Sequence, residues 1–499
     1  MAEPYYISTA ISYPNGEPHI GHAYEAIAAD VMARFRRAEG RDVFFLTGTD
    51  EHGLKMAQAA RAKGVEPRDL VGEMSIKFKT MCDVLDVSYD RFIRTTDPDH
   101  YRASAAIWEA MAAKGDLYLD RYQGWYSVRD EAFYDEDEVV DGANGEKLSP
   151  QGSPVEWTVE ESWFFRLSNY QQPLLDHYAA HPEFVRPETR LNEVLRFVEG
   201  GLRDLSISRT SFDWGIPVPG SPDHVMYVWL DALTNYLTGV GYPDGGEVFE
   251  RFWPADCHLI GKDVVRFHAV YWPAFLMSAG IALPGQIYGH GHLLARGEKM
   301  SKSVGNVVDP LAMAEAYGVD ALRYFLMREV SFGQDGSVSE EALVGRVNAE
   351  LANSFGNLAQ RSLSMVFKNL NGVIPVAGEA IEDIALLAFV EQGCKSLATE
   401  FDRFAFSAGI EAWMGAVFAC NAYVDGQAPW ALKKTDPERM AAVLGTVVAA
   451  VRALAAAIAP VVPRSAGRLI ELIDRGRGGA SIEQPTPTFP RLELAPVAA

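Results

Sequence analysis

The stretch over residues 13–22, Tyr-Pro-Asn-Gly-Glu-Pro-His-Ile-Gly-His, most constrains how this chain can fold. An apolar, β-prone segment precedes it over residues 5–12. Apolar side chains then recur every four residues, a period typical of an amphipathic helix. These side chains are Ala23, Ile27, Val31 and Phe35. The sequence therefore predicts a strand, a Pro/Gly turn and a helix that begins at or just before His19.

A helix N-terminus at this position would suit a phosphate group, because it offers unpaired backbone N–H groups and the positive end of a dipole. Gly21 has no side chain to block a ligand, and His19 and His22, three residues apart, lie on one helical face. The alternative is an ordinary capped helix preceded by an Asn15-Gly16 turn. The stretch alone leaves both interpretations open.

A second stretch, Gly-Glu-Lys-Met-Ser-Lys-Ser over residues 297–303, would by itself be interpreted as a solvated surface loop. Together the two stretches resemble, without a substitution, the two signature motifs of class I aminoacyl-tRNA synthetases. The resemblance implies that four side chains carry catalysis: His19, His22, Lys299 and Lys302. It also implies an ATP site made of His19, Gly21, His22, Gly261, Asp263, Lys299, Met300, Ser301 and Lys302.

Strand-like and helical segments alternate over the first part of the chain, which predicts an α/β fold with a Rossmann-like, doubly wound parallel sheet. Short aromatic runs and an acidic, Gly-rich segment then indicate an inserted β-rich module, and the C-terminal part has the pattern of an all-α bundle. We expect six segments. They are a first catalytic half (1–114), a connective insertion (115–225), a second catalytic half (226–294), a loop and stem-contact region (295–338), a helical anticodon-binding domain (339–473) and a loosely attached C-terminal tail (474–499).

Three dispersed segments, residues 10–16, 227–232 and 428–430, resemble the methionyl-tRNA synthetase family. The resemblance implies a methionine pocket made of Ile11, Tyr13, Asp50, Trp229, Ala232, Tyr236 and His290, with Asp50 holding the substrate ammonium. Aromatic and aliphatic walls match a flexible, polarisable thioether. Trp229 and Tyr236 are seven residues apart, which fits core packing equally well.

The same resemblance implies an anticodon-binding set, Asn357, Arg361 and Trp430, for tRNA(Met). Asn357 and Arg361 are four residues apart, on one helical face, and without the resemblance we would interpret them as a solvated surface. Trp430 follows a proline in an expected loop, where an exposed ring could stack on an unstacked base. Partners would be tRNA(Met), L-methionine and ATP.

The implied reaction is a two-step ligation through methionyl-adenylate, which depends on positioning and charge stabilisation rather than on a protein nucleophile. Mg²⁺ would arrive with ATP, and no protein metal site is evident. The four cysteines, Cys82, Cys257, Cys394 and Cys420, include no Cys-x-x-Cys pair. We therefore expect no structural zinc, as in the branch of the family without zinc knuckles.

Composition limits the other function classes. The 499-residue chain has a net charge of −22, so local patches would have to bind a polyanion. We expect no signal peptide and no membrane span, and we interpret the apolar run over residues 441–462 as a buried helix. A cytoplasmic monomer is the expectation.

Three alternatives stay open at this point. The first is another class I synthetase, most plausibly for cysteine. The second is a small-molecule nucleotidyltransferase of the His-x-Gly-His kind, which would leave the bundle and residues 299–303 unexplained. The third is a synthetase-derived scaffold that binds tRNA without activating an amino acid, which the intact His19, His22, Lys299 and Lys302 argue against.

Overall fold

The computed structural model of the chain describes residues 2–130, 132–142, 145–300 and 306–494. Contacts divide the chain into two compact units. The first contains residues 1–18, 36–83 and 87–290, and the second contains residues 19–35, 84–86 and 291 onward. The predicted residues Ser301 and Lys302 lie outside the described residues.

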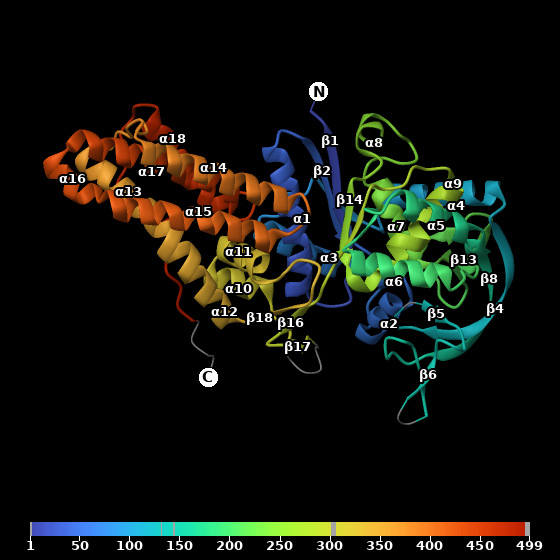
Figure 1. The fold of residues 1–499 in the computed structure, drawn as a ribbon. Helices are drawn as coiled ribbons and strands as arrows, with labels where there is room; N and C mark the ends of the chain where they lie inside the picture. Colours follow the sequence, from blue (N-terminus) through green and yellow to red (C-terminus); the bar gives the residue numbers. More distant parts are fainter. Residues whose placement is uncertain (1, 131, 143–144, 301–305, 495–499) are drawn as a thin grey trace. The chain divides into compact units, whose positions relative to one another are not determined.

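A six-stranded parallel sheet forms the centre of the first unit (Figure 1). Its order is β3 (Arg91–Arg94), β2 (Asp42–Thr49), β1 (Pro4–Thr9), β14 (Cys257–Gly261), β15 (Ile287–His290) and β9 (Val185–Arg186). Every pair is parallel, as between Tyr6 and Phe44 or between Leu259 and Tyr288. The chain continues from β1 to one side of the sheet, through β2 and β3, and later to the other side, through β14 and β15. A topological switch point therefore lies between β1 and β14. Sheets of this kind bind ligands at the carboxyl ends of the strands at such a point. The predicted Rossmann-like class is confirmed.

Helices connect these strands within the first unit. They are α2 (Leu54–Lys63), α3 (Pro67–Val84), α4 (Pro98–Lys114), α5 (Gln171–Ala180), α6 (Glu188–Glu199), α7 (Val228–Thr238), α8 (Glu247–Phe252) and α9 (Trp272–Ala279). α9 is preceded by a 3-10 turn, Lys262–Val264, and a π-helical turn, Phe267–Tyr271. The apolar core contains Tyr6, Ile260 and Trp272, all without exposed surface.

The expected insertion contains a four-stranded antiparallel sheet in the order β10, β8, β4, β5. Its long central pair is β4 (Leu117–Ser127) and β8 (Glu156–Phe165), and its short strands are β5 (Ala132–Tyr134) and β10 (Leu205–Ser206). A hairpin of β6 (Val140–Asp141) and β7 (Lys147–Leu148) and a three-stranded sheet of β11 (Ser208–Arg209), β12 (Pro217–Val218) and β13 (Ser221–Met226) complete it. The sequence missed α5, α6 and β9, the last because a two-residue strand carries no periodicity.

The second unit consists mainly of helices. It contains α1 (Ile20–Ala38) up to residue 35, and a small sheet of β16 (Leu293–Ala295), β17 (Glu298–Lys299) and β18 (Gly336–Val338). Further helices are α10 (Pro310–Tyr317), α11 (Val319–Glu329), α12 (Glu340–Val347), α13 (Asn357–Asn369), α14 (Ile381–Phe401), α15 (Phe406–Gln427), α16 (Pro429–Thr435), α17 (Pro437–Ile458) and α18 (Pro463–Arg477). The predicted all-α bundle is confirmed.

The chain is helical from α12 to α13 and takes a π-helical register between them, at Asn348–Gly356. One local expectation for the second unit is wrong. The loosely attached tail is helical to Arg477, and the segment after it is packed, with 1% of Ile482 and 7% of Phe489 exposed. The Asn348 side-chain amide also donates to the Leu492 carbonyl and accepts from the Leu492 backbone N–H. The sequence did not indicate this packing because Ile482 and Phe489 are too far apart to form a periodic pattern.

Among the described residues, α17 alone is long and apolar enough to pass the length and composition test for a membrane span, with a mean hydropathy of 2.1. Within that apolar window, 61% of the residues are buried inside the protein. α17 packs against α13, α14, α15 and α18, as a core helix does.

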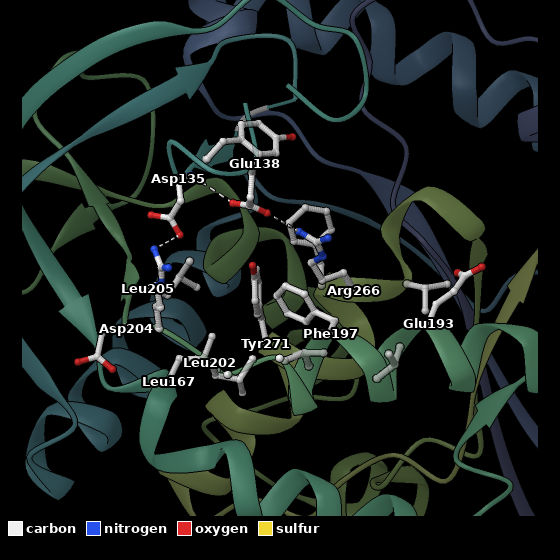
Figure 2. A pocket seen from close by; sticks show the side chains of 18 of the residues that line it. Asp135, Glu138, Leu167, Glu193, Phe197, Leu202, Asp204, Leu205, Arg266 and Tyr271 are labelled. Carbon is white, nitrogen blue, oxygen red and sulfur yellow. Dashed lines mark hydrogen bonds and ion pairs between the residues drawn. The ribbon is translucent and has the colours of Figure 1, made fainter. Parts of the chain in front are cut away.

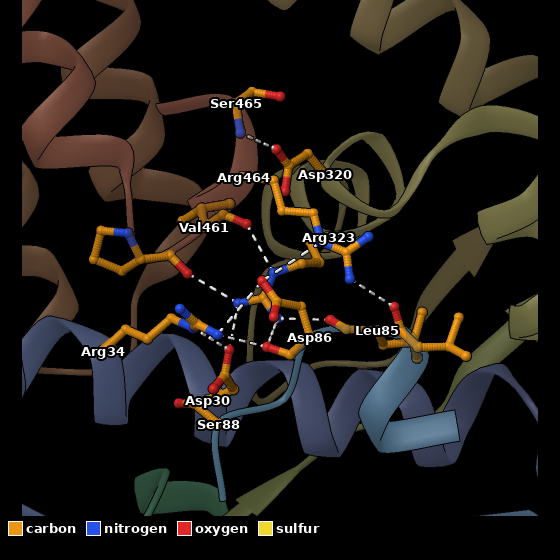
Figure 3. A network of polar contacts seen from close by, with 12 residues as sticks. Asp30, Arg34, Leu85, Asp86, Ser88, Asp320, Arg323, Val461, Arg464 and Ser465 are labelled. Atoms are coloured by element: carbon orange, nitrogen blue, oxygen red, sulfur yellow. Dashed lines mark hydrogen bonds and ion pairs between the residues drawn. The ribbon is translucent and has the colours of Figure 1, made fainter. Parts of the chain in front are cut away.

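A buried ion pair joins four segments of the second unit (Figure 3). The Arg323 guanidinium, on α11, donates from Nη2 to Asp30 Oδ2 on α1 at 2.6 Å, and neither side chain is exposed. Its other N–H groups donate to backbone carbonyls: Pro460 (2.9 Å), Val461 (3.0 Å), Leu85 (3.1 Å) and, more distantly, Asp86 (3.5 Å). Each polar atom of the guanidinium therefore has a partner, which a buried charge requires.

We expect Arg323→Met to lower the free energy of unfolding of the second unit by about 3–5 kcal/mol, because it leaves Asp30 as a buried charge with fewer partners. Hydrogen–deuterium exchange in urea, followed in peptides of α1 and α11, measures the change. The matched control is Arg403→Met, which removes a surface ion pair with Glu400 and should cost at most about 1 kcal/mol. Equal small effects of both variants would contradict the role given to Arg323.

Candidate functional site

The His19 turn opens α1 as the sequence predicts. The backbone N–H of His19 donates to His22 Nδ1, and that of Gly21 donates to His19 Nδ1, both at 3.1 Å. The two rings lie with centroids 3.8 Å apart. Since each Nδ1 accepts a hydrogen bond, each neutral imidazole carries its proton on Nε2 and presents it as a donor. A Cβ at position 21 would lie 2.9 Å from the His19 ring, so a side chain there would displace this imidazole.

The second signature begins in a hairpin of the same unit. Lys299 ends β17, which pairs with β16 through Leu294, and Met300 follows, half-buried. The segment beyond residues 301–305 returns to the first signature, because the backbone N–H of Ile20 donates to Val308 O at 3.0 Å. The second unit therefore brings the start of α1 next to the chain that leaves the Lys-Met-Ser-Lys-Ser stretch.

In the first unit, the segments after β1 and β2 are held side by side. Ser12 donates its backbone N–H to Gly48 O, and Asp50 donates its own to Ser12 O, both at 2.9 Å. The Tyr13 hydroxyl donates to His52 O at 3.0 Å. Asp50 is buried, with 7% of its surface exposed, while Ile11 and Tyr13 are half-buried. The structure thus brings Tyr13 and Asp50 together.

The α7 helix carries the three predicted side chains Trp229, Ala232 and Tyr236. The Trp229 ring stacks on Phe267, with centroids 3.8 Å apart and planes at 6°. Tyr236 is 1% exposed, and its ring stacks on His258 at 4.0 Å. The structure therefore places Tyr236 in the core. Its hydroxyl group bonds to His268, whose ring contacts Trp229.

His268, which the sequence analysis did not single out, contacts both aromatic residues. Its Nε2 lies 2.7 Å from the Tyr236 hydroxyl and its ring centroid 6.2 Å from that of Trp229. Its Nδ1 donates to the carbonyl of Val264 at 2.9 Å. Because a carbonyl only accepts, the proton is on Nδ1, so Tyr236 donates to Nε2. Burial lowers the pKa of His268 to about 4, although the Val264 carbonyl partly opposes this.

His290, which the sequence predicts in the methionine pocket, lies at the carboxyl end of the sheet. It ends β15, where its Cα pairs in register with Gly261, and it is 6% exposed. Its strand is thus the neighbour of the one that leads to Gly261 and Asp263, two of the predicted ATP-binding residues. His268 escaped notice because it sits inside an apolar helix, where a lone histidine suggests core packing.

A cavity of about 620 Å³ is lined on one side by Lys262 and Asp263. Figure 2 shows Glu138, Arg266 and Phe197 from its lining. Side chains of the insertion line its other side, and several of them are paired. The Arg266 guanidinium lies 4.1 Å over the Phe197 ring and 4.0 Å from Glu138. Similar numbers of basic and acidic side chains line the cavity, among them Arg196, Arg203, Arg209, Lys262, Arg266, Asp135, Asp137, Glu138, Glu193, Asp204 and Asp263. The mixture suits a ligand with both charges or a polar ligand better than a bare polyanion.

The three predicted anticodon residues lie on two neighbouring helices of the second unit. Asn357 and Arg361 are exposed on α13, and Trp430 is 48% exposed. The Arg361 guanidinium carbon lies 5.6 Å from the centroid of the Trp430 ring, so these two are brought together. Trp430 stands in the first turn of α16 and not in the expected loop, because Ala428 takes a left-handed conformation (φ 44°) and Pro429 begins a helix.

Metal ligands are sparse in the part of the chain that the structure describes. No group of three His, Cys, Asp or Glu side chains there could hold a metal ion. Cys82, Cys257 and Cys420 are buried as free thiols, and Cys394 is half-buried.

We expect the imidazole of His268 to stay neutral, with its proton on Nδ1, down to about pH 4–5. Because the unfolded chain would bind a proton near pH 6.5, this residue should lower stability as the pH falls from 6.5 toward 4. Nitrogen NMR of histidine-labelled protein, assigned with a His268→Gln variant, measures the titration. A midpoint near pH 6.5 would contradict the assignment.

Comparison with known proteins gives the family directly. The family model described as tRNA synthetases class I (M) matches residues 5–363, and the anticodon binding domain of methionyl tRNA ligase matches residues 374–480. A methionine–tRNA ligase of Brucella suis biovar 1 is 54% identical over 98% of both chains. One of Mesorhizobium japonicum is 58% identical over 94% of this chain and 91% of its own.

Among solved structures, a Mycobacterium tuberculosis methionyl-tRNA synthetase in complex with methionyl-adenylate superimposes with a TM-score of 0.95. It is 55% identical, covering 98% of this chain and 100% of its own. A strand–turn–helix start with a His-Ile-Gly-His turn, a split parallel sheet and a C-terminal helical bundle are thus matched over nearly the full length. The chain belongs to the class I tRNA synthetases of the methionine type.

Proposed function

We propose that this chain ligates L-methionine to tRNA(Met) in an ATP-dependent reaction through methionyl-adenylate. The observation that carries the proposal is the aromatic site of the first unit, where Trp229 stacks on Phe267 and Tyr236 bonds to a neutral His268. Such a site offers polarisable surface and no charge to a side chain, which suits a thioether. The likeness to methionine–tRNA ligases over nearly the full chain agrees with it.

Different residues would recognise the thioether side chain of methionine and its ammonium group. Ile11, Tyr13, Trp229, Ala232, Tyr236 and His268 would surround the thioether. Asp50 would pair with the ammonium group, because an ionised carboxylate at the end of β2 finds a use for its charge there. His290 would contribute to the same pocket from the end of β15.

The first step would be nucleotidyl transfer. A methionine carboxylate oxygen attacks the α-phosphorus of ATP, a new P–O bond forms, the bond to the bridging oxygen breaks, and pyrophosphate leaves. The Nε2–H groups of His19 and His22 would donate to phosphate oxygens at the start of α1. Lys299 and Lys302 would neutralise the departing pyrophosphate, with Met300 and Ser301 beside them. Protein groups then act by positioning and charge stabilisation.

In the second step, a hydroxyl of the terminal tRNA ribose attacks the carbonyl carbon of the adenylate. An ester bond forms, the bond to the phosphate oxygen breaks, and AMP leaves. The helical bundle would select the tRNA, with Trp430 and Arg361 offering a stacked pair of planar groups to anticodon bases and Asn357 a hydrogen bond.

Several further expectations belong to this proposal. Mg²⁺ would arrive with ATP, bound through its phosphates. The enzyme would act in the cytoplasm, as a monomer and without structural zinc. The six segments expected from the sequence stay a prediction of domain boundaries, with α5, α6 and β9 falling inside the insertion.

Exchange of labelled pyrophosphate into ATP, run with each of the twenty amino acids and no tRNA, tests the activation step. We expect exchange with methionine and not with the other nineteen. Exchange with another amino acid would keep the class of enzyme and overturn the pocket. No exchange, with or without tRNA, would favour a scaffold that binds tRNA.

We expect Trp430→Ala to lower kcat/KM for tRNA in aminoacylation between about tenfold and a hundredfold, the loss of one stacked base. Methionine-dependent pyrophosphate exchange should stay normal, since it needs no tRNA. The matched control is Trp157→Ala, which removes an equally exposed ring, 51% against 48%, from the insertion. Unchanged aminoacylation by the Trp430→Ala variant would contradict the assignment of Trp430 to anticodon binding.

A further inference from the structure

A fully buried carboxylate lies behind the proposed methionine site and has no part in the chemistry described so far. Asp231, on α7, accepts hydrogen bonds from His52 Nδ1 at 2.6 Å and His100 Nε2 at 2.8 Å, and all three side chains are at most 1% exposed. Burial opposes the charge, but the two imidazoles outweigh it and hold the pKa of the Asp231 carboxyl below its ordinary value. A buried charge that is fully paired is costly to break.

The network connects two segments that carry predicted methionine ligands. Asp231 stands on α7 between Trp229 and Ala232. His52 stands two residues after Asp50 in the turn that follows β2, and its carbonyl accepts from the Tyr13 hydroxyl. The Asp231–His52 contact thus spans 179 positions of sequence to join the turn to the helix.

Other contacts of the turn lead elsewhere. Glu51 is fully buried and pairs with Arg94 through both carboxylate oxygens, at 2.7 and 2.9 Å. That pair fixes the turn to β3, its neighbour in the sheet. His52 Nε2 lies 3.0 Å from the Tyr101 hydroxyl, on α4. The side-chain contact from this turn to α7 runs through Asp231.

We propose that Asp231 is a positioning residue for amino-acid binding, holding the turn that carries Asp50 against the helix that carries Trp229 through its bond to His52. The inference rests on the proposed function, because the substrate must reach both side chains at once. Asp231 does not touch the substrate. A shift of either segment would separate the ammonium partner from the apolar wall and weaken methionine binding, while ATP binding would be unaffected.

The matched pair His52→Asn and His52→Gln tests the bond itself. An asparagine amide nitrogen occupies nearly the place of Nδ1 and can donate to Asp231, whereas a glutamine amide reaches the place of Nε2 and cannot. We expect His52→Gln to raise the methionine KM in pyrophosphate exchange at least tenfold with ATP KM within twofold. His52→Asn should keep methionine KM within about threefold.

Asp231→Leu and Asp231→Asn give a second pair on the other partner. Leucine abolishes both hydrogen bonds and should raise methionine KM at least tenfold. The asparagine side-chain oxygen still accepts a hydrogen bond from one imidazole. The second imidazole can change tautomer and accept a hydrogen bond from the asparagine NH₂ group, so we expect a smaller rise in methionine KM. Thr234→Val is the control, since this buried hydroxyl on the same helix bonds only to Leu230 O.

Equal effects of His52→Asn and His52→Gln would overturn the proposal, as would a loss confined to kcat with methionine KM unchanged. If Asp231→Leu fails to fold, the His52 pair still decides, because asparagine keeps the bond to Asp231 and gives up the one to Tyr101, whereas glutamine does the reverse. Failure of the proposed function is separate: wild-type enzyme would then exchange with another amino acid. The same KM split, measured for that amino acid, would still confirm or overturn the role of Asp231.

Discussion

The ion pair between Asp30 and Arg323 is the interaction on which the arrangement of the second unit depends. It binds α1 to α11, and the same guanidinium reaches the turns at residues 85 and 460–461, so helices far apart in the sequence share one anchor. α1 begins with the His19 turn, so its first turn can be fixed only if the helix itself is fixed. The Ile20–Val308 hydrogen bond then ties that turn to the chain leaving the second signature. A buried pair with every N–H group satisfied supplies rigidity that surface ion pairs cannot.

The first unit relies on a different constraint, the common direction of its parallel strands. Tyr13 follows β1, Asp50 follows β2, and Asp263 follows β14, so each side chain needs only to stand a few residues beyond a strand to reach the same edge. Hydrogen bonds between Ser12, Gly48 and Asp50 keep the first two segments in register beyond the end of the ladder. The sheet therefore determines the place of these residues, and the turns determine only their orientation.

Local pattern explains what could be predicted. The strand–turn–helix start and the bundle follow from periodicity and from motifs of neighbouring residues. His268 and Asp231 could not be assigned in this way, because their partners lie 32, 131 and 179 positions away. A histidine in an apolar helix looks like core until the fold places a tyrosine hydroxyl against it. The packing of the segment after Arg477 could not be predicted either, because Ile482 and Phe489 are isolated apolar residues in a polar stretch.

The distribution of protons in the first unit bears on selectivity. His268 is neutral: its Nδ1 donates a hydrogen bond to Val264 O, and its Nε2 accepts one from the Tyr236 hydroxyl, so both protons of this pair are already used. A polar side chain of methionine's length, such as glutamine, would find no donor on this pair for its amide oxygen, and an unpaired buried amide group costs about 1–3 kcal/mol. A thioether loses almost nothing on entering the same space. Under the proposal, charge is kept instead at Asp50, as the partner of the ammonium group, and at Asp231, where two imidazoles satisfy it. The Trp229 indole Nε1 is a buried donor with no partner among the described residues, so it is a group at this site that a polar competitor could use. Selectivity for methionine would then depend on how few hydrogen-bonding groups the site leaves to a competitor.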